Sequence, residues 1–374
     1  MTIRIGVDAR HLSGLNNGIQ TYLLNLLHYS IKSTKDTHEW FLYCPYNVDK
    51  NFFNYEHVKI INTPISTKFI GFHIVFSQIF IPILSLIDRV DIVWFPANRS
   101  SLFFPKSIAR VVSIHDVVWK KYPETMKYTV LKLDKFFMMR SAKLADIVTT
   151  VSHSSFDDIV RAGVSDSNKI IVVSNGVNRP NSIEKKIDRS FFLFVSTLEP
   201  RKNLTRLLQA YGSLPLSIKE KMKLVIVGGK GWGEVNLLDT ITQLDLTEYV
   251  KVLGRVDDAT LAALYANAQF LVMPSLYEGF GLPLVEAMSY GTPVLTANNS
   301  SMPEVTGNAG LLVDALDVES IADGLQEMIT NNELRERLAK NAKLNASRYS
   351  WDNSAQKLIK VFEKAIDLRK DKLS

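Results

Sequence analysis

The 374 residues are enough for two domains of ordinary size, and a composition of 46% hydrophobic and 22% charged residues excludes a disordered chain and favours a globular α/β protein. The single cysteine, Cys44, excludes an internal disulfide and a cysteine-rich metal site, and its apolar neighbours predict a buried strand residue. The net charge of +6 arises in residues 1–180, which hold 21 basic against 14 acidic side chains, and this excess indicates either solubility or attraction to an anionic surface.

Strand and helix patterns alternate from the first residues onward, which is typical of doubly wound parallel sheets. Met1–Ile5 lacks the layout of a signal peptide and leads directly into a strand, so we expect a cytoplasmic protein. Expected strands of the first half are Ile3–Val7, Trp40–Cys44, Val58–Ile61, Ile92–Phe95, Val111–Ile114, Ile147–Val151 and Ile170–Val173. Expected helices are Gly18–Ile31, Ile70–Ile87, Thr129–Leu144 and Ser155–Ala162.

The segment Phe69–Ile87 has nineteen residues without a full charge, which is long enough for a membrane span. It also contains His73, Gln78 and a central Pro82, and it continues directly into a predicted strand. A buried or membrane-facing helix is therefore the preferred interpretation, and a membrane span is the alternative.

A polar segment with a proline, Arg179–Lys186, predicts a linker between two domains. Expected strands beyond it are Phe191–Val195, Lys223–Val227, Val250–Leu253, Phe270–Met273, Pro293–Leu295 and Gly310–Val313. Expected helices are Leu204–Tyr211, Asn236–Leu244, Ala259–Ala266, Pro283–Ser289, Val318–Ile329 and Glu333–Arg348. We expect one domain over residues 1–180, a second over 181–350, and a last helix in 351–374 that packs back on the first.

The most informative run is Ser275–Met288, in which Glu278 and Glu286 lie eight residues apart. The glycines of its first half predict a loop with accessible N–H groups, and the residues from Pro283 predict the start of a helix. A glycine loop that enters a helix N-terminus favours bound anions. Because carboxylates repel phosphate, we expect the two glutamates to accept hydrogen bonds from sugar hydroxyls. The run therefore predicts a nucleotide-sugar pocket.

Two adjacent cations, Arg201 and Lys202, follow the strand Phe191–Val195 and precede a helix. Arginine can hold a diphosphate through two parallel hydrogen bonds, and lysine adds a point charge. A solvated basic turn is the alternative, but the glutamate run expected at the same sheet edge favours a binding role.

Glycines follow two further strands of the second half. The turn Gly228–Gly231 lacks the spacing of a dinucleotide fingerprint. Its Gly229 is expected to approach a nucleotide closely, with a plain turn as the alternative. Gly254, which directly follows the expected strand Val250–Leu253, is a candidate for contacting the base.

Two residues of the first half lie where predicted strands give way to loops. Gly18 follows a flexible turn and begins a helix, so its N–H is a candidate donor to a diphosphate. His115 follows the strand Val111–Ile114, where an imidazole can bind a hydroxyl or carry a proton. A structural histidine is the alternative.

Neither a metal nor an organic cofactor is expected. The chain has no Asp-x-Asp pair and no His-Glu-x-x-His spacing, so the cation pair and a helix N-terminus would have to carry the charge of a diphosphate. The P-loop and the nucleophile elbow are also missing from the sequence.

Together these features resemble the retaining glycosyltransferases of family 4, which have the GT-B fold of two doubly wound, Rossmann-like domains facing a cleft. The matching features span nearly the whole chain: Gly18, His115-Asp116, Glu199–Asn203, Gly228-Gly229 and the Glu-x7-Glu run from Glu278 to Glu286. Asp8-Ala9-Arg10 and Thr197–Asn203 are most similar to bacterial enzymes that build O-antigen and related polysaccharides, many of them mannosyl- or rhamnosyltransferases. The apolar Phe69–Ile87 is the nearest to a departure from the pattern.

The resemblance implies roles for the matched residues. Arg201 and Lys202 would hold the donor diphosphate, Glu286 the ribose hydroxyls and Glu278 the transferred sugar. His115 would face the sugar and the acceptor, and Asp116 receives no catalytic role. The other implied donor-binding residues are Gly18, Gly229, Gly254, Gly279, Phe280, Gly281 and Leu282, the last three through backbone N–H groups.

The expected reaction is transfer of a hexose, by resemblance mannose from GDP-mannose, to a hydroxyl of a lipid-diphosphate-linked glycan with retention of the anomeric configuration. A dTDP- or UDP-sugar is the alternative donor. The basic first domain would meet the inner face of the inner membrane, with a solvated helix face as the alternative. The candidate membrane residues are Lys120, Lys121, Lys127, Lys132, Lys135, Arg140 and Lys143, interleaved with Trp119, Tyr122, Tyr128, Phe136 and Phe137.

Other functions fit part of the pattern. A nucleotide-sugar epimerase or a sugar phosphorylase shares the two-domain plan, and an epimerase would convert the donor alone. A two-lobed sugar-binding protein without chemistry is a second alternative, although exported binders of that kind need a signal peptide. Nucleic-acid binding is suggested only by the pI near 9.1, because the positive charge is dispersed and no nucleic-acid motif occurs.

Overall fold

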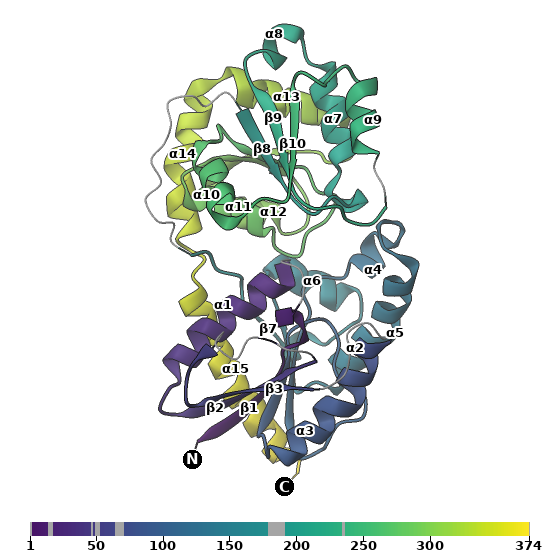
Figure 1. The fold of residues 1–374 in the computed structure, drawn as a ribbon, viewed down its shortest axis with the longest axis vertical. Coiled ribbons are helices and arrows are strands. Elements are labelled where there is room, and N and C mark those ends of the chain that lie inside the picture. The colour runs from purple at the N-terminus through teal and green to yellow at the C-terminus, as the bar shows by residue number, and fades with distance from the viewer. Residues whose placement is uncertain are drawn as a thin grey trace. The chain divides into compact units, whose positions relative to one another are not determined.

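The computed structural model describes residues 2–13, 18–45, 48, 53–63, 71–178, 191–233 and 236–373. The linker expected at Arg179–Lys186 and the turn expected at residues 14–17 lie outside them. The described residues form two compact units, each built around one parallel sheet (Figure 1). The first unit comprises Met1–Lys120, Tyr128–Asn175 and Trp351–Ser374, and the second comprises Lys121–Lys127 and Gly176–Ser350.

The sheet of the first unit has seven parallel strands in the order β3-β2-β1-β4-β5-β6-β7. They are β1 (Ile3–Asp8), β2 (His38–Cys44), β3 (Val58–Asn62), β4 (Ile92–Phe95), β5 (Ala109–Ser113), β6 (Ile147–Thr150) and β7 (Ile170–Val172). Helices cover both faces of such a sheet, so its central strands are apolar without alternation. All four residues of β4 are accordingly buried.

The sheet of the second unit has six parallel strands in the order β10-β9-β8-β11-β12-β13. They are β8 (Phe191–Val195), β9 (Lys223–Val227), β10 (Val250–Gly254), β11 (Leu271–Met273), β12 (Val294–Ala297) and β13 (Gly310–Val313). Both sheets have the doubly wound architecture expected from the alternation in the sequence, and the predicted fold class is confirmed.

The helices lie close to their predicted positions. Those of the first half are α1 (Gly18–Ser33), α2 (Phe72–Val75), α3 (Ile81–Ile87), α4 (Val118–Lys121), α5 (Tyr128–Leu144) and α6 (His153–Arg161). Those of the second half are α7 (Leu204–Ser213), α8 (Leu216–Lys219), α9 (Leu237–Gln243), α10 (Asp258–Asn267), α11 (Leu282–Ser289), α12 (Met302–Thr306), α13 (Val318–Thr330), α14 (Asn332–Ala346) and α15 (Trp351–Asp371). The sequence did not predict α4, α8 and α12, because four or five residues are too few to show a helical period.

The strand order reverses once in each sheet. The reversal falls between β1 and β4 in the first unit and between β8 and β11 in the second. Loops that leave two such strands diverge to opposite sides of the sheet, and the crevice between them is where open α/β sheets bind ligands.

The apolar segment of the first unit is a helix with a wide turn inside it. A π-helical turn, Phe76–Phe80, joins α2 to α3. Within the described part of the chain, no helix is both long and apolar enough to cross a bilayer. Phe69 and Ile70, the first two residues of the expected segment, lie outside the described residues.

The last helix, α15, belongs to the first unit although it follows the second in sequence. It packs on α1, and its Phe362 contacts the rings of Trp40 and Trp94 at centroid distances of 6.2 and 5.9 Å. Near its end, Arg369 and Lys372 donate to the carboxylate of Asp146, which has no exposed surface, at 2.6 and 3.0 Å. An aromatic cluster and two ion pairs thus fix the C-terminal segment to the first sheet.

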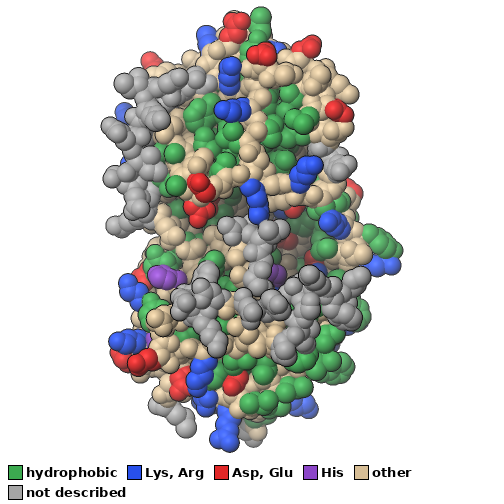
Figure 2. Space-filling model, in the orientation of Figure 1, with side chains coloured by type: hydrophobic (Ala, Val, Ile, Leu, Met, Phe, Trp, Pro, Cys, Tyr) green, Lys and Arg blue, Asp and Glu red, His purple; other side chains and the backbone are tan. Residues whose placement is uncertain are grey.

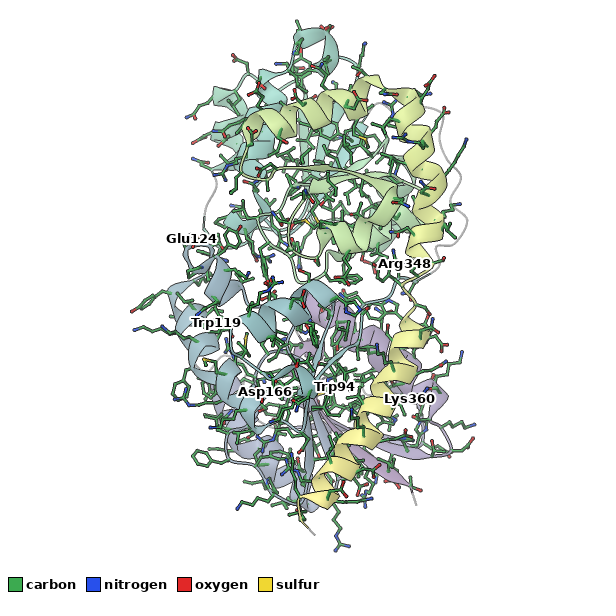
Figure 3. All side chains as sticks on the ribbon, turned by 180° about the vertical axis from the view of Figure 1, so that it is seen from behind. Trp94, Trp119, Glu124, Asp166, Arg348 and Lys360 are labelled. Carbon is green, nitrogen blue, oxygen red and sulfur yellow. The ribbon has the colours of Figure 1, made fainter. Side chains whose placement is uncertain are left out.

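The substitution Phe362→Ala should lower the free energy of unfolding by about 3–5 kcal/mol, because it leaves a cavity between two tryptophans. Chemical denaturation monitored by tryptophan fluorescence measures the change. Lys360→Ala is the matched control, since Lys360 is an exposed residue of the same helix (Figure 3) and its loss should change the free energy by less than about 0.5 kcal/mol. Equal effects of the two substitutions would show that Phe362 does not anchor the helix.

Candidate functional site

The predicted cation pair and the first glutamate of the Glu-x7-Glu run meet at the reversal point of the second sheet. Arg201 and Lys202 lie in a short 3-10 helix, Pro200–Lys202, in the loop that follows β8. Glu278 lies in the loop that follows β11, the neighbour of β8 in the sheet. The doubly wound topology therefore brings together side chains 76 and 77 positions apart.

Glu278 accepts hydrogen bonds from both cations. Lys202 Nζ donates to Oε1 at 2.6 Å, and Arg201 Nη1 donates to Oε2 at 3.0 Å. The same Arg201 nitrogen also donates to the Tyr277 carbonyl oxygen at 2.5 Å, and Glu199 lies 3.8 Å from Arg201 Nη2. Both cationic side chains are only 15% exposed, so water screens these charges weakly.

The burial and the opposite charges act against each other at Glu278. Burial alone would raise the pKa of its carboxyl group, but the charges of Lys202 and Arg201 outweigh that effect and lower the pKa to about 2. Burial and the neighbouring Arg201 charge lower the pKa of Lys202, while Glu278 opposes that shift. Glu278 is therefore ionised at neutral pH, and it forms a triad with the two basic side chains.

Asn203 holds the loops around the triad together. It has a left-handed backbone (φ 62°), and its side-chain nitrogen donates to the carbonyl oxygens of Pro274 and Ala315 at 2.9 and 2.7 Å. Leu276 N donates to the Arg201 carbonyl oxygen at 2.9 Å. The sequence motif contains Asn203, but its role as the clamp between the loops was not predicted.

The loop after β12 supports Glu278 from a third direction. Glu278 N donates to Ser300 Oγ at 3.0 Å, and Ser301 Oγ bonds the carbonyl oxygens of both Glu278 and Phe280 at 3.0 Å. Sequence reasoning missed Ser300 and Ser301. Their only sequence signal is the polar cluster Asn298–Ser301 directly after a strand.

Gly281 makes the turn from this loop into α11. Its φ of 95° is a left-handed conformation that favours glycine, and a Cβ there would lie 3.0 Å from the side chains of Leu284 and Met273. The helix begins at Leu282 with Pro283 next to it, as predicted within one residue. The N–H groups at this helix start belong to the segment that carries Glu278, and they are suited to an anion.

Glu286, the second glutamate of the run, has a different environment. It lies in α11 and accepts a hydrogen bond from the Tyr265 hydroxyl at 2.7 Å, and the Tyr265 ring stacks on Tyr290. Burial raises the pKa of Glu286, and the hydrogen bond from Tyr265 only partly opposes this. The two glutamates of one motif thus have opposite pKa shifts, and Tyr265 is a partner that the sequence did not indicate.

The glycine turn after β9 packs on the loop that carries the cation pair. A Cβ on Gly228 (φ 151°) would lie 1.7 Å from the Ser196 carbonyl oxygen. Leu198 N donates to the Gly229 carbonyl oxygen at 3.0 Å, and Gly228 N donates to that of Gly254 at 2.8 Å. This close approach of two backbone segments accounts for the glycine at 228. Gly229 lies in the same turn, and Gly254 is the last residue of the neighbouring strand β10.

In the first unit, His115 follows β5 and has a defined tautomer. Its Nε2 lies 2.7 Å from the Pro96 carbonyl oxygen, which can only accept, so Nε2 carries the proton and Nδ1 presents a lone pair. Burial lowers the pKa of His115, so the neutral ring is favoured, while the bond to Pro96 opposes the shift. The Tyr22 ring and the imidazole form a T-shaped pair with their centroids 4.7 Å apart, and the Tyr22 hydroxyl lies 3.2 Å from Ser113 Oγ.

The remaining predicted site residues are placed as follows. Gly18 is the first residue of α1, and the turn before it lies outside the described residues. Phe280 is buried against the ring of Tyr349 at 5.2 Å. Within the described ranges, no three histidine, cysteine, aspartate or glutamate side chains cluster as a metal site would require.

Two family models together match nearly the whole chain. Residues 16–179 match the model described as Glycosyltransferase Family 4, and residues 177–345 match the one described as Glycosyl transferases group 1.

Among curated relatives, the chain is 30% identical over 292 residues to the O-antigen chain mannosyltransferase B of Escherichia coli, covering 75% of this chain and 76% of that protein. It is 31% identical over 247 residues to the O-antigen chain mannosyltransferase RfbU of Salmonella typhimurium, covering 66% and 67%.

Solved structures share the fold at low identity. Sucrose-phosphate synthase from Thermosynechococcus elongatus has a TM-score of 0.78 at 17% identity, covering 97% of this chain and 98% of that one. WaaG, a glycosyltransferase involved in lipopolysaccharide biosynthesis, has a TM-score of 0.74 at 17% identity, covering 95% and 98%. The chain therefore belongs to the family 4 glycosyltransferases of GT-B fold, and the resemblance to this family deduced from the sequence is confirmed.

The opposite pKa shifts of the two glutamates predict opposite effects of removing each charge. The pKa of Glu278 lies at about 2, below its ordinary 4.5, so its stabilising contribution is complete above pH 4.5 and is lost as the pH falls toward 2. Glu278→Gln should therefore lower the free energy of unfolding at pH 7 by about 3 kcal/mol, and the difference from the wild type should shrink below pH 4.5.

Glu286→Gln is the matched control within the same motif. Because burial raises the pKa of Glu286, its ionised form is disfavoured in the folded chain, and the neutral variant should be at least as stable as the wild type at pH 7. Denaturant titrations at several pH values measure both effects. A pH-independent loss of stability in both variants would contradict the proposed electrostatics.

Proposed function

Because the chain belongs to this family, we propose that it transfers mannose from GDP-mannose to a hydroxyl of a lipid-diphosphate-linked glycan at a membrane surface and retains the anomeric configuration. The observation that carries the proposal is the buried triad of Arg201, Lys202 and Glu278 at the strand reversal of the second sheet. An activated sugar carries a negatively charged diphosphate and hydroxyl groups that donate hydrogen bonds. The triad offers positive charge for the first and an acceptor for the second within one site.

The cation pair suits the leaving group. Departure of a nucleoside diphosphate leaves negative charge on its oxygens while the sugar carbon becomes cationic. Two weakly screened cations would stabilise that charge as it grows. The start of α11 adds a partial charge of about half a unit if the diphosphate lies near it. A donor would thus replace Glu278 as the partner of Arg201 and Lys202.

Glu278 suits the sugar. An ionised carboxylate only accepts hydrogen bonds, and hexose hydroxyls donate them. Its pKa of about 2 makes it a poor general base at neutral pH, because it holds a proton too weakly. We therefore assign it to binding the transferred hexose, and the departing phosphate oxygen would take the proton of the acceptor hydroxyl. That assignment needs no side chain as a base, and it is compatible with retention.

His115 and Glu286 would bind other hydroxyls. The Nδ1 lone pair of His115 is an acceptor for a hydroxyl of the sugar or the acceptor, and Pro96 fixes its orientation. Glu286 would accept from the ribose hydroxyls, and Tyr265 would hold its second oxygen in place. The names of the Escherichia coli and Salmonella relatives support mannose as the sugar and a bacterial surface glycan as the acceptor.

Lys202→Ala should reduce turnover about 10²–10³-fold, because one preorganised charge on the leaving group is lost. Steady-state release of the nucleoside diphosphate measures the rate. The matched control is Lys223→Ala, which removes an exposed cation at the amino end of β9, the opposite sheet edge from the site. The control should retain turnover within a few fold. Near-normal turnover of Lys202→Ala would contradict the proposed stabilisation of the leaving group.

The donor assignment predicts selective stabilisation by one nucleoside diphosphate. At a concentration of about 100 Kd, a ligand that binds only the folded chain stabilises it by about 2.7 kcal/mol, so GDP should raise the melting temperature more than UDP or dTDP.

Proton NMR of the product formed with GDP-mannose should show the anomeric configuration of the donor, and turnover should persist in excess EDTA. A larger shift with UDP or dTDP would select the alternative donors, and conversion of the donor without an acceptor would indicate an epimerase.

A further inference from the structure

Backbone strain in the described part of the chain occurs mainly beside the residues proposed to bind the substrates. Outside the glycines, the residues with a left-handed backbone there are Arg89, Asn98, Asn203, Asp245 and Ser300. This conformation is unfavourable for a residue with a Cβ, so it persists where the surrounding structure holds it, and such residues cluster at functional sites. Asn203 and Ser300 border the triad of the second unit, and Asn98 lies at the carboxyl edge of the first sheet.

Asn98 joins two loops of the first unit. It lies in the loop that follows β4, which is the neighbour of β5 and one of the two strands at the reversal point. Its backbone N–H donates to the Ser113 carbonyl oxygen at 2.8 Å, and its side-chain Oδ1 accepts from His115 N at 3.0 Å. These bonds continue the contact between β4 and β5 beyond their last paired residues, Phe95 and Val112. Asn98 therefore holds the backbone that leads into His115.

His115 is held from other directions as well. The Pro96 carbonyl oxygen accepts from its Nε2 at 2.7 Å, and Ser155 Oγ donates to its carbonyl oxygen at 2.9 Å. The Tyr22 ring packs on the imidazole with the centroids 4.7 Å apart. Over the described residues, hydrogen bonds occupy the backbone N, the backbone O and Nε2 of His115, and none reaches Nδ1. The protein thus fixes the residue and leaves its acceptor nitrogen for a ligand.

The second unit has the same arrangement at its triad. Ser300 (φ 47°) lies in the loop after β12, the neighbour of β11, and its Oγ accepts from Glu278 N at 3.0 Å. Asn98 (φ 53°) has the same relation to His115. In each unit a left-handed residue of one loop accepts from the backbone N–H of a proposed hydroxyl-binding residue on the neighbouring loop. The recurrence of an unfavourable conformation at both places indicates a role in placing these two residues.

Asparagine suits position 98 for two reasons. It tolerates a left-handed backbone better than most residues, and its side-chain carbonyl oxygen accepts a hydrogen bond from a backbone N–H. Loss of that oxygen would leave the partly buried N–H of His115 without its partner, which favours a shift of the loop. Glycine would keep the backbone conformation but not the acceptor, and aspartate would keep the acceptor but add a charge.

We propose that Asn98 is a positioning residue, which fixes His115 so that its Nδ1 accepts a hydrogen bond from a hydroxyl of the transferred sugar or of the glycan acceptor. The inference rests on the proposed function, which assigns such a hydroxyl to His115. Burial lowers the pKa of His115, while the bond to Pro96 and the charge of Asp116 oppose that shift. A ring held in this buried place is therefore a neutral acceptor at pH 7.

Steady-state kinetics of two variants, with the donor that supports turnover, test the proposal. Asn98→Gly should lower kcat about tenfold, because the backbone of His115 loses its acceptor. Asn98→Asp keeps an acceptor and should retain kcat within about threefold at pH 8. Its added carboxylate favours the charged imidazole, so its activity should fall at a higher pH than that of the wild type on acidification. The rise in melting temperature with GDP, UDP and dTDP should be unchanged in both variants, because these ligands lack the hexose.

NMR titration of the histidine imidazoles gives a second measurement, made without substrates. His115→Gln identifies the signals of His115 among those of the seven histidines. In the wild type the neutral ring should persist below pH 6.5, because burial lowers its pKa. In Asn98→Gly the ring should take up its proton at a higher pH, because a displaced imidazole is more accessible to water.

The matched control is Arg89→Gly, which replaces another left-handed residue of the first unit. Arg89 (φ 49°) is exposed and precedes β4, at the sheet edge opposite His115. Figure 2 shows Lys and Arg side chains, in blue, at the lower end of the view, where Figure 1 draws the C-terminus, so this surface carries other cations. The control should keep kcat within about twofold and leave the titration of His115 unchanged.

Three outcomes would overturn the proposal: wild-type kcat and titration in Asn98→Gly, equal losses in Asn98→Gly and Arg89→Gly, or equal losses of kcat in Asn98→Gly and Asn98→Asp at pH 8. His115→Ala separates the inference from the proposed function. Near-normal turnover of His115→Ala would refute the role proposed for His115 itself. An inactive His115→Ala together with an unaffected Asn98→Gly would refute only the role of Asn98.

Discussion

The second unit depends on one buried interaction, the ion triad in which Glu278 binds both Arg201 and Lys202. Two adjacent cations at low exposure repel each other, and a carboxylate between them is the simplest way to keep both charged. In the proposed function the same arrangement would bind an activated sugar, because a diphosphate would pair with the two cations while the carboxylate would accept hydrogen bonds from sugar hydroxyls. The stability of the site and its proposed chemistry therefore have one electrostatic origin.

The backbone around the triad is fixed by residues that carry no charge. Asn203 adopts a left-handed backbone and ties the loop after β8 to the loops after β11 and β13. Ser300 and Ser301 hold Glu278 from the loop after β12. These loops follow the carboxyl ends of four strands of one sheet. A change at any of these strand ends would displace the charged side chains, and a binding site needs such groups within about 0.5 Å of their required positions.

Much of this arrangement follows from the sequence, and the reasons are local. Apolar runs such as Ile92–Phe95 identify the strands, and the doubly wound order then predicts that the loops carrying Arg201 and Glu278 share one sheet edge. The clamp made by Asn203, the tyrosine that holds Glu286 and the packing of Tyr22 on His115 depend on residues far apart in sequence, so no spacing reveals them. The π-helical turn is likewise invisible in an apolar segment, because every register of that segment is apolar.

The two glutamates show why a motif alone does not define an electrostatic role. Glu278 and Glu286 are eight residues apart and both poorly exposed to water, yet cations depress the pKa of one while burial beside a tyrosine hydroxyl raises that of the other. A charged acceptor beside a cation pair suits the end of the donor where charge separates, whereas an acceptor oriented by Tyr265 suits neutral hydroxyls that do not change during the reaction. The roles proposed for the two carboxylates, binding of the transferred sugar by Glu278 and of the ribose by Glu286, would rest on these different partners.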